Sequence, residues 1–550
     1  MLQSLKLENF KAFGERANIP FAPITLIFGE NSAGKSSILQ ALYLLKQTLE
    51  SGDTGAPLLP HAYNEIVDLG NFKEMLFDHD LKRTLSICVE TTMNKSYETS
   101  QLPYKENTIT IEFRFKFSAI EAEVLLDEIG IYDQQSSRCI AKFQPLNTTE
   151  EHDEFWRRMG FSDYVLDHHV PVPSKSSAVE CVWLTEEPEY WESEFAWCKE
   201  NNEEIRNRFE HQKSRLEDQL LHREMGEEKE NSSEIIQQFN AWDRRQISSL
   251  SVALEFLSSN FDLKAYISKR CEEEMNKVLT LEGPLPVRCI SNKSNSFIER
   301  SRSLLPAISD DTKVFHIAEL VIEAGKALGQ TLRVLYPIRP FRSIPQRYYI
   351  PTGTNPWHVG YWGHLLPDLL FSHPELVKQT NEWLKRLDID YMLEVKPFGT
   401  DPGDPFAMRL VDTRRKEPVN VALPDVGFGI SQLLPFIVQS LVSEGRIISI
   451  EQPEVHVHPR LQADLGDLLV EAIKKQHRNQ FIIETHSEHL ILRLQRRIYE
   501  KQIKPEDVSV IYVSRGPEGA KAERLRLDEE GDFIDEWPNG FFLERLRELR

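Results

Sequence analysis

A glycine-rich segment near the N-terminus has the residue types and spacing that suit phosphate binding. The octapeptide GENSAGKS occupies residues 29–36, directly after the apolar run 24–28. Its two glycines allow backbone N–H groups to curl around phosphates, Lys35 can reach the β- and γ-phosphates, and the Ser36 hydroxyl can bind Mg²⁺. Apolar residues in 37–46 have helical spacing, so the positive end of a helix would face the anion. The segment predicts a nucleoside triphosphate site.

Two later apolar segments end in polar side chains that suit nucleotide chemistry. Residues 446–450 lead into Glu451, and the segment 480–487 ends in polar residues that include His486. A carboxylate at the end of a core strand can hold Mg²⁺ through water, and a polar residue at the end of a second core strand can sense the γ-phosphate. We expect Glu451 and His486 to have these roles. The alternative is that residues 451–454 form only a polar turn.

The residue after the acid is Gln452, at the position that normally polarises the attacking water. A glutamine can orient water but is a poor base. The sequence therefore predicts either slow turnover or a replacement of this role by Glu454.

A second glycine-containing segment precedes another apolar helix. Residues 425–432 include Gly429, Ser431 and Gln432, and they lead into the apolar residues 433–442. Small residues and a hydroxyl at a helix N-terminus can bind an anion. Since one site does not need two such segments, we expect this one to cover a nucleotide bound by a neighbouring subunit. A simple N-cap with flexible glycines is the alternative.

The composition describes an acidic chain of two or three structural units. Its 550 residues exceed the size at which one hydrophobic core keeps growing. A net charge of -21 argues against a generally nucleic-acid-binding surface but leaves room for local basic patches. The six cysteines form no CxxC pair and are expected to be reduced, which favours a cytoplasmic location. No apolar run approaches 18 residues, so we expect no membrane span.

The chain is expected to have three parts. Residues 1–120 alternate like strands around one helix and form half of a nucleotide-binding unit, and residues 331–550 form the other half. Residues 121–330 are expected to be a mainly helical insertion. Charged helical patterns at 192–222 and 235–250 predict a helical hairpin that serves as a lid or short arm, with a compact helical subdomain as the alternative.

Five segments together resemble the ABC-type ATPases of the AAA family, which include SMC, RecF and OLD-like proteins and ATPases of bacterial anti-phage systems. In chain order they read ENFKAF, GENSAGKSS, GFGISQLLPF, IISIEQPEVHVHP and FIIETHSEHL. The ending DEWPNGFF resembles an element of a subset of these, most similar to the PtuA ATPases of Septu-type systems, including retron-associated versions. The resemblance implies an α/β fold, with an ABC-type P-loop ATPase head formed by both ends of the chain.

The resemblance also implies roles for individual residues. It assigns the Walker A loop to Gly29, Asn31, Gly34, Lys35, Ser36 and Ser37, the Walker B acid to Glu451, the signature motif acting in trans to Gly429, Ser431 and Gln432, and the switch histidine to His486. Ser36 and Glu451 would hold Mg²⁺. The chain departs from the family at two positions. Glu451 stands where Asp is more usual, which preserves the metal geometry, and Gln452 stands where the catalytic Glu is usual, which favours a nucleotide-gated switch with slow hydrolysis. His456 and His458 are expected at dimer contacts, with a metal pair as the alternative.

The implied partners are other copies of the chain, arranged head to tail, and an HNH-type nuclease. A retron reverse transcriptase, its msDNA or another nucleic acid is a further expected partner, and ATP and Mg²⁺ are the cofactors. Candidate partner surfaces are the insertion 121–330 and the loop that carries Arg339, Arg342 and Arg347. The alternatives are a RecF-like DNA-binding repair ATPase and a self-contained OLD-like nuclease. The residues after His489 are too few for the Toprim domain of the latter.

Two acidic or histidine-containing segments are expected to be unrelated to catalysis. The cluster from Asp528 to Asp535 is expected to be a solvated charged turn, with a metal site as the alternative. The segment Asp167-His168-His169 is expected to be a surface loop, since it lacks the other parts of a nuclease motif.

Overall fold

The computed structural model describes most of both ends of the chain and part of its middle. The described residues are 1–51, 57–61, 66–93, 108–119, 123–133, 139–144, 178–180, 202–226, 244, 247, 279–282, 285–289, 323–401, 403–414, 416–417, 419–474 and 477–538. The segment 167–169, most of the expected helical arm 235–250 and the end of the terminal element lie outside them.

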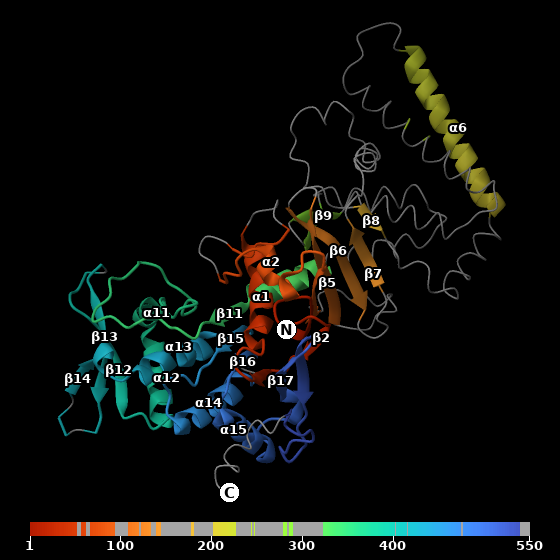
Figure 1. Ribbon diagram of the computed structural model, residues 1–550. Helices are drawn as coiled ribbons and strands as arrows, with labels where there is room; N and C mark the ends of the chain where they lie inside the picture. Colours follow the sequence, from red (N-terminus) through yellow and green to blue (C-terminus); the bar gives the residue numbers. More distant parts are fainter. Residues whose placement is uncertain are drawn as a thin grey trace.

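A six-stranded sheet at the centre of the molecule joins the two ends of the chain (Figure 1). All neighbouring strands in it are parallel except the last pair, which is antiparallel. In spatial order the strands are β11 (Leu335–Ile338), β15 (Ile447–Glu451), β16 (Gln480–Glu484), β3 (Ile24–Gly29), β17 (Val508–Gly516) and β18 (Gly519–Leu525). The N-terminal strand β3 therefore lies between two strands from the C-terminal part of the sequence.

The inner strands β3 and β16 carry mostly apolar residues because helices or a second sheet cover both faces. Every residue of β3 and β16 is buried. In β3, Ile27 belongs to the hydrophobic core that includes α1 (Lys35–Glu50). Its neighbour Leu26 belongs to a second core with α13 (Phe428–Val442), α14 (Pro459–Ala472) and α15 (Glu488–Tyr499). The α/β fold and the joining of the two chain ends in one head are thus confirmed.

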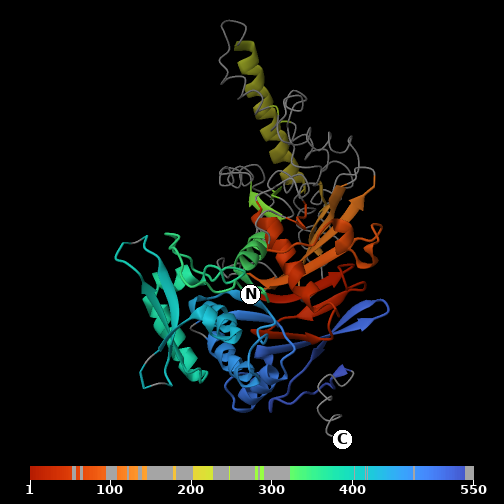
Figure 2. The same ribbon diagram turned by 60° about the vertical axis from the view of Figure 1, so that its left-hand side comes forward.

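A seven-stranded antiparallel sheet covers the other side of α1 and shares its core (Figure 2). Its strands, in spatial order, are β2 (Ala17–Pro20), β1 (Leu2–Glu8), β4 (Leu85–Thr92), β5 (Thr108–Ser118), β6 (Glu123–Asp133), β7 (Cys139–Gln144) and β8 (Ala178–Glu180). The sheet thus continues past the expected boundary at residue 120. Strand β6 pairs with β5 over its full length, so the sequence change near residue 121 does not mark the edge of the sheet.

A smaller lobe lies beside the central sheet and contains helices and three antiparallel strands (Figure 1). It is built from α11 (Leu366–Ser372), α12 (Pro374–Arg386), β12 (Tyr391–Pro397), β13 (Phe406–Asp412) and β14 (Val419–Ala422). It packs on the same core as α13 and α14. The described chain also contains the short elements α2 (Phe72–Met75), η1 (Phe77–His79), β9 (Leu279–Glu282), β10 (Leu285–Cys289), η4 (Leu423–Asp425) and η5 (Pro505–Asp507).

The first of the two expected helical arms is present as α6 (Asn202–Gly226). The helix begins at residue 202, whereas the charged pattern begins at residue 192. Both ribbon views show α6 apart from the two large sheets (Figures 1 and 2). Among the helices that the structure describes, none has both the length and the apolar character needed to cross a membrane.

Candidate nucleotide-binding site

The glycine-rich loop connects the end of β3 to the start of α1, as its sequence predicts. Gly29 ends the strand at φ +144° and Gly34 precedes the helix at φ +107°. A Cβ atom on Gly29 would lie 2.1 Å from the carbonyl oxygen of Val513, and one on Gly34 would lie 2.6 Å from the Cβ of Ala12. Both positions therefore require glycine, for backbone conformation as well as for space.

Lys35 is buried at the start of α1 and folds back over the loop. Its ammonium donates hydrogen bonds to the carbonyl oxygens of Gly29 and Glu30, at 3.1 and 2.8 Å. Burial lowers the pKa of Lys35, while the negative charges of Glu484 and Glu454 oppose that shift. The lysine is thus held beside the loop and within electrostatic reach of two carboxylates.

The serines and the asparagine of the loop have different surroundings. The Ser36 hydroxyl donates a 2.8 Å hydrogen bond to Oε2 of Glu484. Ser37 is buried, and its backbone N–H donates to Gly34. Asn31 is exposed, and its carbonyl oxygen accepts a 2.7 Å hydrogen bond from Arg515. The loop is therefore anchored on both sides by residues from the C-terminal part of the chain.

Three largely buried carboxylates, those of Glu451, Glu454 and Glu484, lie at or just after the ends of β15 and β16. Glu451 ends β15 and Glu484 ends β16, and the two are direct partners in the parallel register. Burial, and then the charge of Glu484, raise the pKa of Glu451 to about 7. Burial raises the pKa of Glu484 and of Glu454 as well. Crowded, buried negative charge of this kind favours a bound cation.

Glu454 lies in the turn after β15, where its carboxylate is fixed by the end of β16. Oε2 accepts a 2.8 Å hydrogen bond from the Thr485 hydroxyl, and Oε1 accepts a 2.7 Å hydrogen bond from the backbone N–H of His486. Gln452 lies in the same turn at φ +47°, and its N–H donates to the Glu484 carbonyl oxygen. The turn is therefore joined to the end of β16 by one backbone bond, and to the two residues after β16 by the Glu454 carboxylate.

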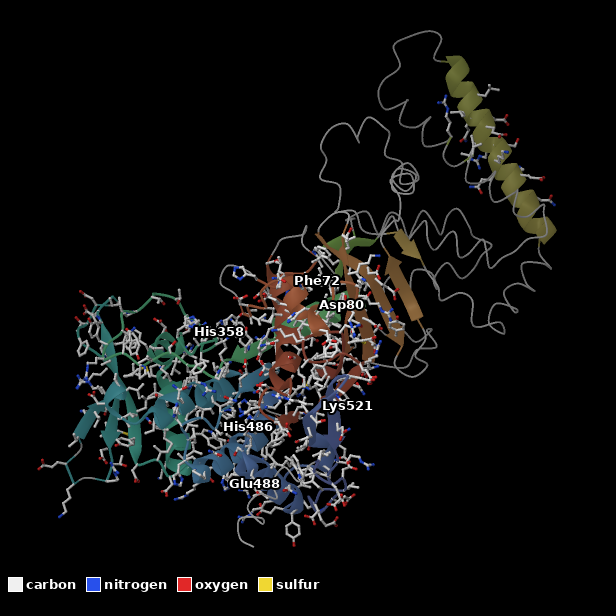
Figure 3. All side chains as sticks on the ribbon, in the orientation of Figure 1. Phe72, Asp80, His358, His486, Glu488 and Lys521 are labelled. Carbon is white, nitrogen blue, oxygen red and sulfur yellow. The ribbon has the colours of Figure 1, made fainter. Side chains whose placement is uncertain are left out.

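His486 is half-buried at the centre of the head (Figure 3). Burial, and then the positive charge of Lys35, lower its pKa, so the imidazole is neutral near pH 7. Its Nε2 atom is buried and has no hydrogen-bond partner. A neutral ring with a free nitrogen beside the lysine of the loop suits contact with a bound phosphate.

The segment expected to act on a neighbouring subunit forms the start of α13. Gly427 is exposed at the N-cap, whereas Ser431 and Gln432 are buried within the chain. A Cβ atom on Gly429 would lie 2.7 Å from the carbonyl oxygen of His456. Among the described contacts, this segment packs on the turn after β15 and does not join the residues around Lys35.

The arginine-containing loop after β11 differs from the expected partner surface. Arg339 stacks on the Trp362 ring, with the guanidinium carbon 4.6 Å from the ring centroid. Arg347 is exposed and forms a double hydrogen bond with Asp425 at 2.8 and 2.7 Å. Arg342 is only 5% exposed and donates to the Glu451 carbonyl oxygen at 3.4 Å. The expectation that Arg342 serves as surface is therefore wrong, because the loop folds inward at this residue.

Sequence reasoning missed two residues of this site. The sequence does indicate Glu484, since this carboxylate directly follows the apolar residues of the second segment. From the sequence, only His486 is predicted as the functional residue at the end of that segment. Arg342 has no such signal, since arginine is usually exposed and its loop has no periodicity.

The remaining candidate residues lie in turns or at the start of a helix, where their described contacts are local. Nδ1 of His458 accepts the backbone N–H of Arg460 and caps α14, and His456 is exposed at φ +62°. Oδ1 of Asp528 accepts the N–H groups of Glu530 and Asp532, which confirms a charged turn. Within the described ranges, no group of three His, Cys, Asp or Glu side chains is arranged to hold a metal ion.

Trp537 of the terminal element packs against strands β3 and β17, next to the loop that precedes α1. The Trp537 ring lies edge-on to Phe28 of β3, with the centroids 5.4 Å apart, and it also contacts Tyr512 and Phe533. The C-terminal part of the chain thus supports the strand that carries Gly29.

Comparison with known families and structures gives the following matches. A family model described as "AAA ATPase domain" matches residues 1–279 and 370–491. A second, described as "Protein of unknown function (DUF3696)", matches residues 503–550. No curated protein sequence matches the chain.

Similar solved structures include three SMC head domains. One is the Smc head domain of Pyrococcus furiosus with an extended coiled coil, bound to the C-terminal domain of ScpA; it is 12% identical over 100% of this chain and 99% of that chain, with a TM-score of 0.36. The head domain with a coiled coil and joint from Pyrococcus yayanosii is 13% identical over 96% and 98%, with a TM-score of 0.35. The head domain from Thermotoga maritima is 8% identical over 96% and 99%, with a TM-score of 0.36. Similarity this distant carries no argument about function.

The family match covers more than half of the sequence and includes the loop at 29–36 and the ends of β15 and β16. It spans both parts of the chain that build the central sheet, which agrees with an ABC-type P-loop head. The chain therefore belongs to the AAA ATPase domain family.

Proposed function

We propose that this chain binds ATP with Mg²⁺ between the loop at 29–36 and the ends of β15 and β16. One observation carries the proposal: the Ser36 hydroxyl and the Lys35 ammonium lie beside Glu484, and Glu451 is the register partner of Glu484. Residues from the two ends of the sequence thus lie together in one cluster, which supports binding of phosphate and metal there.

The residues of the loop would hold the phosphates. Lys35 would bind the β- and γ-phosphates, and the backbone of Gly29, Asn31 and Gly34, with Ser37 at the start of α1, would surround them. Ser36 and Glu451 would hold Mg²⁺, which supplies charge neutralisation for the phosphates. The register pairing of Glu451 with Glu484, and the Ser36 hydroxyl bonded to Glu484, fit such an ion.

Water activation is proposed for Glu454, with Gln452 in an orienting role. Burial raises the pKa of Glu454, and its carboxylate is held in place by two donors. A raised pKa makes a carboxylate a better base near neutral pH. Gln452 can orient the water but cannot take its proton, so activation depends on Glu454 alone and turnover is slower than it would be with a base at position 452. His486 would contact the terminal phosphate through its unpaired nitrogen.

ATP binding is proposed to assemble two copies head to tail, so that the start of α13 in one copy completes the site of the other. This part rests on the resemblance to ABC-type ATPases and on the exposed Gly427 at the helix start. Gly429, Ser431 and Gln432 belong to this contact, and the buried side chains of the two polar residues would hold the helix start in shape. His456, exposed nearby, would lie at the same contact.

The biological role is proposed to be control of an HNH-type nuclease in an anti-phage complex of the cytoplasm. It rests on the resemblance to PtuA ATPases, and retron components are candidate triggers. A nucleotide-gated assembly can hold or release such an effector, because ATP binding biases one of two arrangements.

The first test compares Lys35→Ala with Lys82→Ala, an exposed lysine on the same lobe. Lys35→Ala should abolish ATP binding in a titration with a fluorescent ATP analogue, whereas the control should bind like the wild type. Unchanged affinity in the Lys35 variant would remove the proposed site. Co-purification with an HNH protein encoded next to the gene, with and without ATP, then tests the partner. Salt-dependent DNA binding by the ATPase alone would instead favour the RecF-like alternative.

A further inference from the structure

The side chain of Arg342 is an unsatisfied cation inside the candidate site. It is 5% exposed, and its Nε and Nη1 atoms are buried without a hydrogen-bond partner. Only Nη2 donates, at 3.4 Å, to the backbone oxygen of Glu451. A guanidinium carries five N–H donors, so most of its hydrogen-bonding capacity is unused. Buried groups of this kind are rare unless a ligand completes them.

The position of Arg342 follows from the path of the chain. Strand β11 pairs in parallel with β15, and Ile338 is the partner of Ile450. Both strands therefore end at the same edge of the sheet, where ligands of open α/β sheets usually bind. The chain then runs from residue 339 to residue 365 without a helix or strand, and it folds inward at Arg342.

The charges around Arg342 indicate what the missing ligand is. The nearest negative charges are those of Glu454 and Glu451. Both oxygens of Glu454 already accept hydrogen bonds from Thr485 and His486. Glu454 also lies within electrostatic reach of Lys35, so the two buried cations are near the same carboxylate. A phosphate anion bound by Lys35 would supply the acceptor oxygens that Nε and Nη1 of Arg342 lack.

We propose that Arg342 is a ligand of the terminal phosphate of the bound nucleoside triphosphate, and that it makes the site distinguish a triphosphate from a diphosphate. The fork of a guanidinium matches two phosphate oxygens, and its buried position excludes competing water. This inference rests on the proposed ATP site and adds to it a residue that lies outside the matched family segments 1–279 and 370–491.

The test compares two arginines of the same loop in the full-length protein. Mg²⁺-ATP and Mg²⁺-ADP are titrated against the wild type, Arg342→Gln and Arg347→Gln. Arg347 is exposed and bonded to Asp425, so its variant controls for the loss of a loop arginine. Arg342→Gln should weaken ATP binding about tenfold or more, as expected for the loss of a hydrogen-bonded ion pair, and should change ADP binding less than about twofold. Arg347→Gln should change neither.

The other outcomes are decisive as well. Equal losses for ATP and ADP, or no loss for either, would overturn the inference while leaving the ATP site intact. A wild type that binds neither nucleotide would overturn the proposed function itself. If Arg342→Gln does not fold, Arg342→Lys keeps the charge and removes the fork. ATP and ADP each raise the unfolding temperature of the protein, and in Arg342→Lys the difference between these two rises should be smaller than in the wild type. An unchanged difference would also contradict the inference.

Discussion

The carboxylate of Glu454 accepts a 2.7 Å hydrogen bond from the backbone N–H of His486. This contact joins the turn after β15 to the end of β16 and directs a buried acid towards the glycine-rich loop. The negative charge of Glu454 also acts on the Lys35 ammonium, where it opposes the lowering of the pKa by burial. Although Glu454 lies in a turn, hydrogen bonds from Thr485 and His486 fix the position of its carboxylate.

Replacement of Glu454 by Gln should abolish most ATP hydrolysis and leave ATP binding in place. The amide keeps the shape and one acceptor of the side chain but cannot take a proton. We expect turnover to fall by about 100-fold or more, as for other lost general bases. Phosphate release and ATP affinity, measured side by side, check this. Glu506→Gln, at an exposed position, is the control. Normal turnover in Glu454→Gln would assign water activation to another group.

Replacement of Gln452 by Glu should speed hydrolysis. The variant places a base directly after Glu451, where a glutamine now orients water without accepting its proton. We expect kcat to rise by about tenfold, with little change in ATP affinity. Steady-state phosphate release at saturating ATP is the measurement. A flat or reduced rate would mean that Glu454 or another group already activates the water as well as a base at position 452 can.

Glu451 should make the stability of the metal-free protein depend on pH. Its pKa is about 7 in the folded chain, above the ordinary value of 4.5. Folding therefore favours the protonated form, so the contribution of Glu451 to stability is complete below pH 4.5 and is lost as the pH rises through 7. Glu451→Gln should be more stable than the wild type at pH 8, by up to about 3 kcal/mol.

The measurement is thermal unfolding in EDTA at several pH values between 5 and 8. The gap between Glu451→Gln and the wild type should grow with pH, and Mg²⁺ with ATP should reduce it, because the ligand compensates the carboxylate. A gap that does not depend on pH would show that Glu451 is not protonated by burial.

Gly29→Ala should disrupt the loop far more than Gly353→Ala. Both glycines have positive φ, at +144° and +71°. The new Cβ of Gly29 would meet the Val513 carbonyl oxygen at 2.1 Å, whereas the Cβ of Gly353 would meet nothing within 4 Å. Gly353→Ala therefore costs only backbone strain, about 1 kcal/mol, and Gly29→Ala adds a clash with backbone that cannot move. Equal unfolding temperatures for the two variants would contradict this account.

Much of the head could be predicted because its signals are local. The spacing within residues 29–36 predicts a strand, a loop and a helix, and the structure has β3, that loop and α1. The apolar runs before Glu451 and Glu484 predict buried strands, since parallel strands covered on both faces are apolar throughout. The extent of the seven-stranded sheet is harder to predict from the sequence. Strand β6 is defined by its pairing with β5, which composition does not reveal.

The sequence by itself determined the class of chemistry at residues 29–36 and the buried strands that lead to Glu451 and His486, because those signals depend on neighbours a few positions apart. Only the tertiary structure decided that Ser36 bonds to Glu484, 448 positions later, and that Arg342 lies buried against Glu451, 109 positions later. The order of strands and the path of a loop without regular structure set such contacts. Residue types do not encode either feature, since the same arginine would be solvated on the surface and is buried only where the chain folds inward.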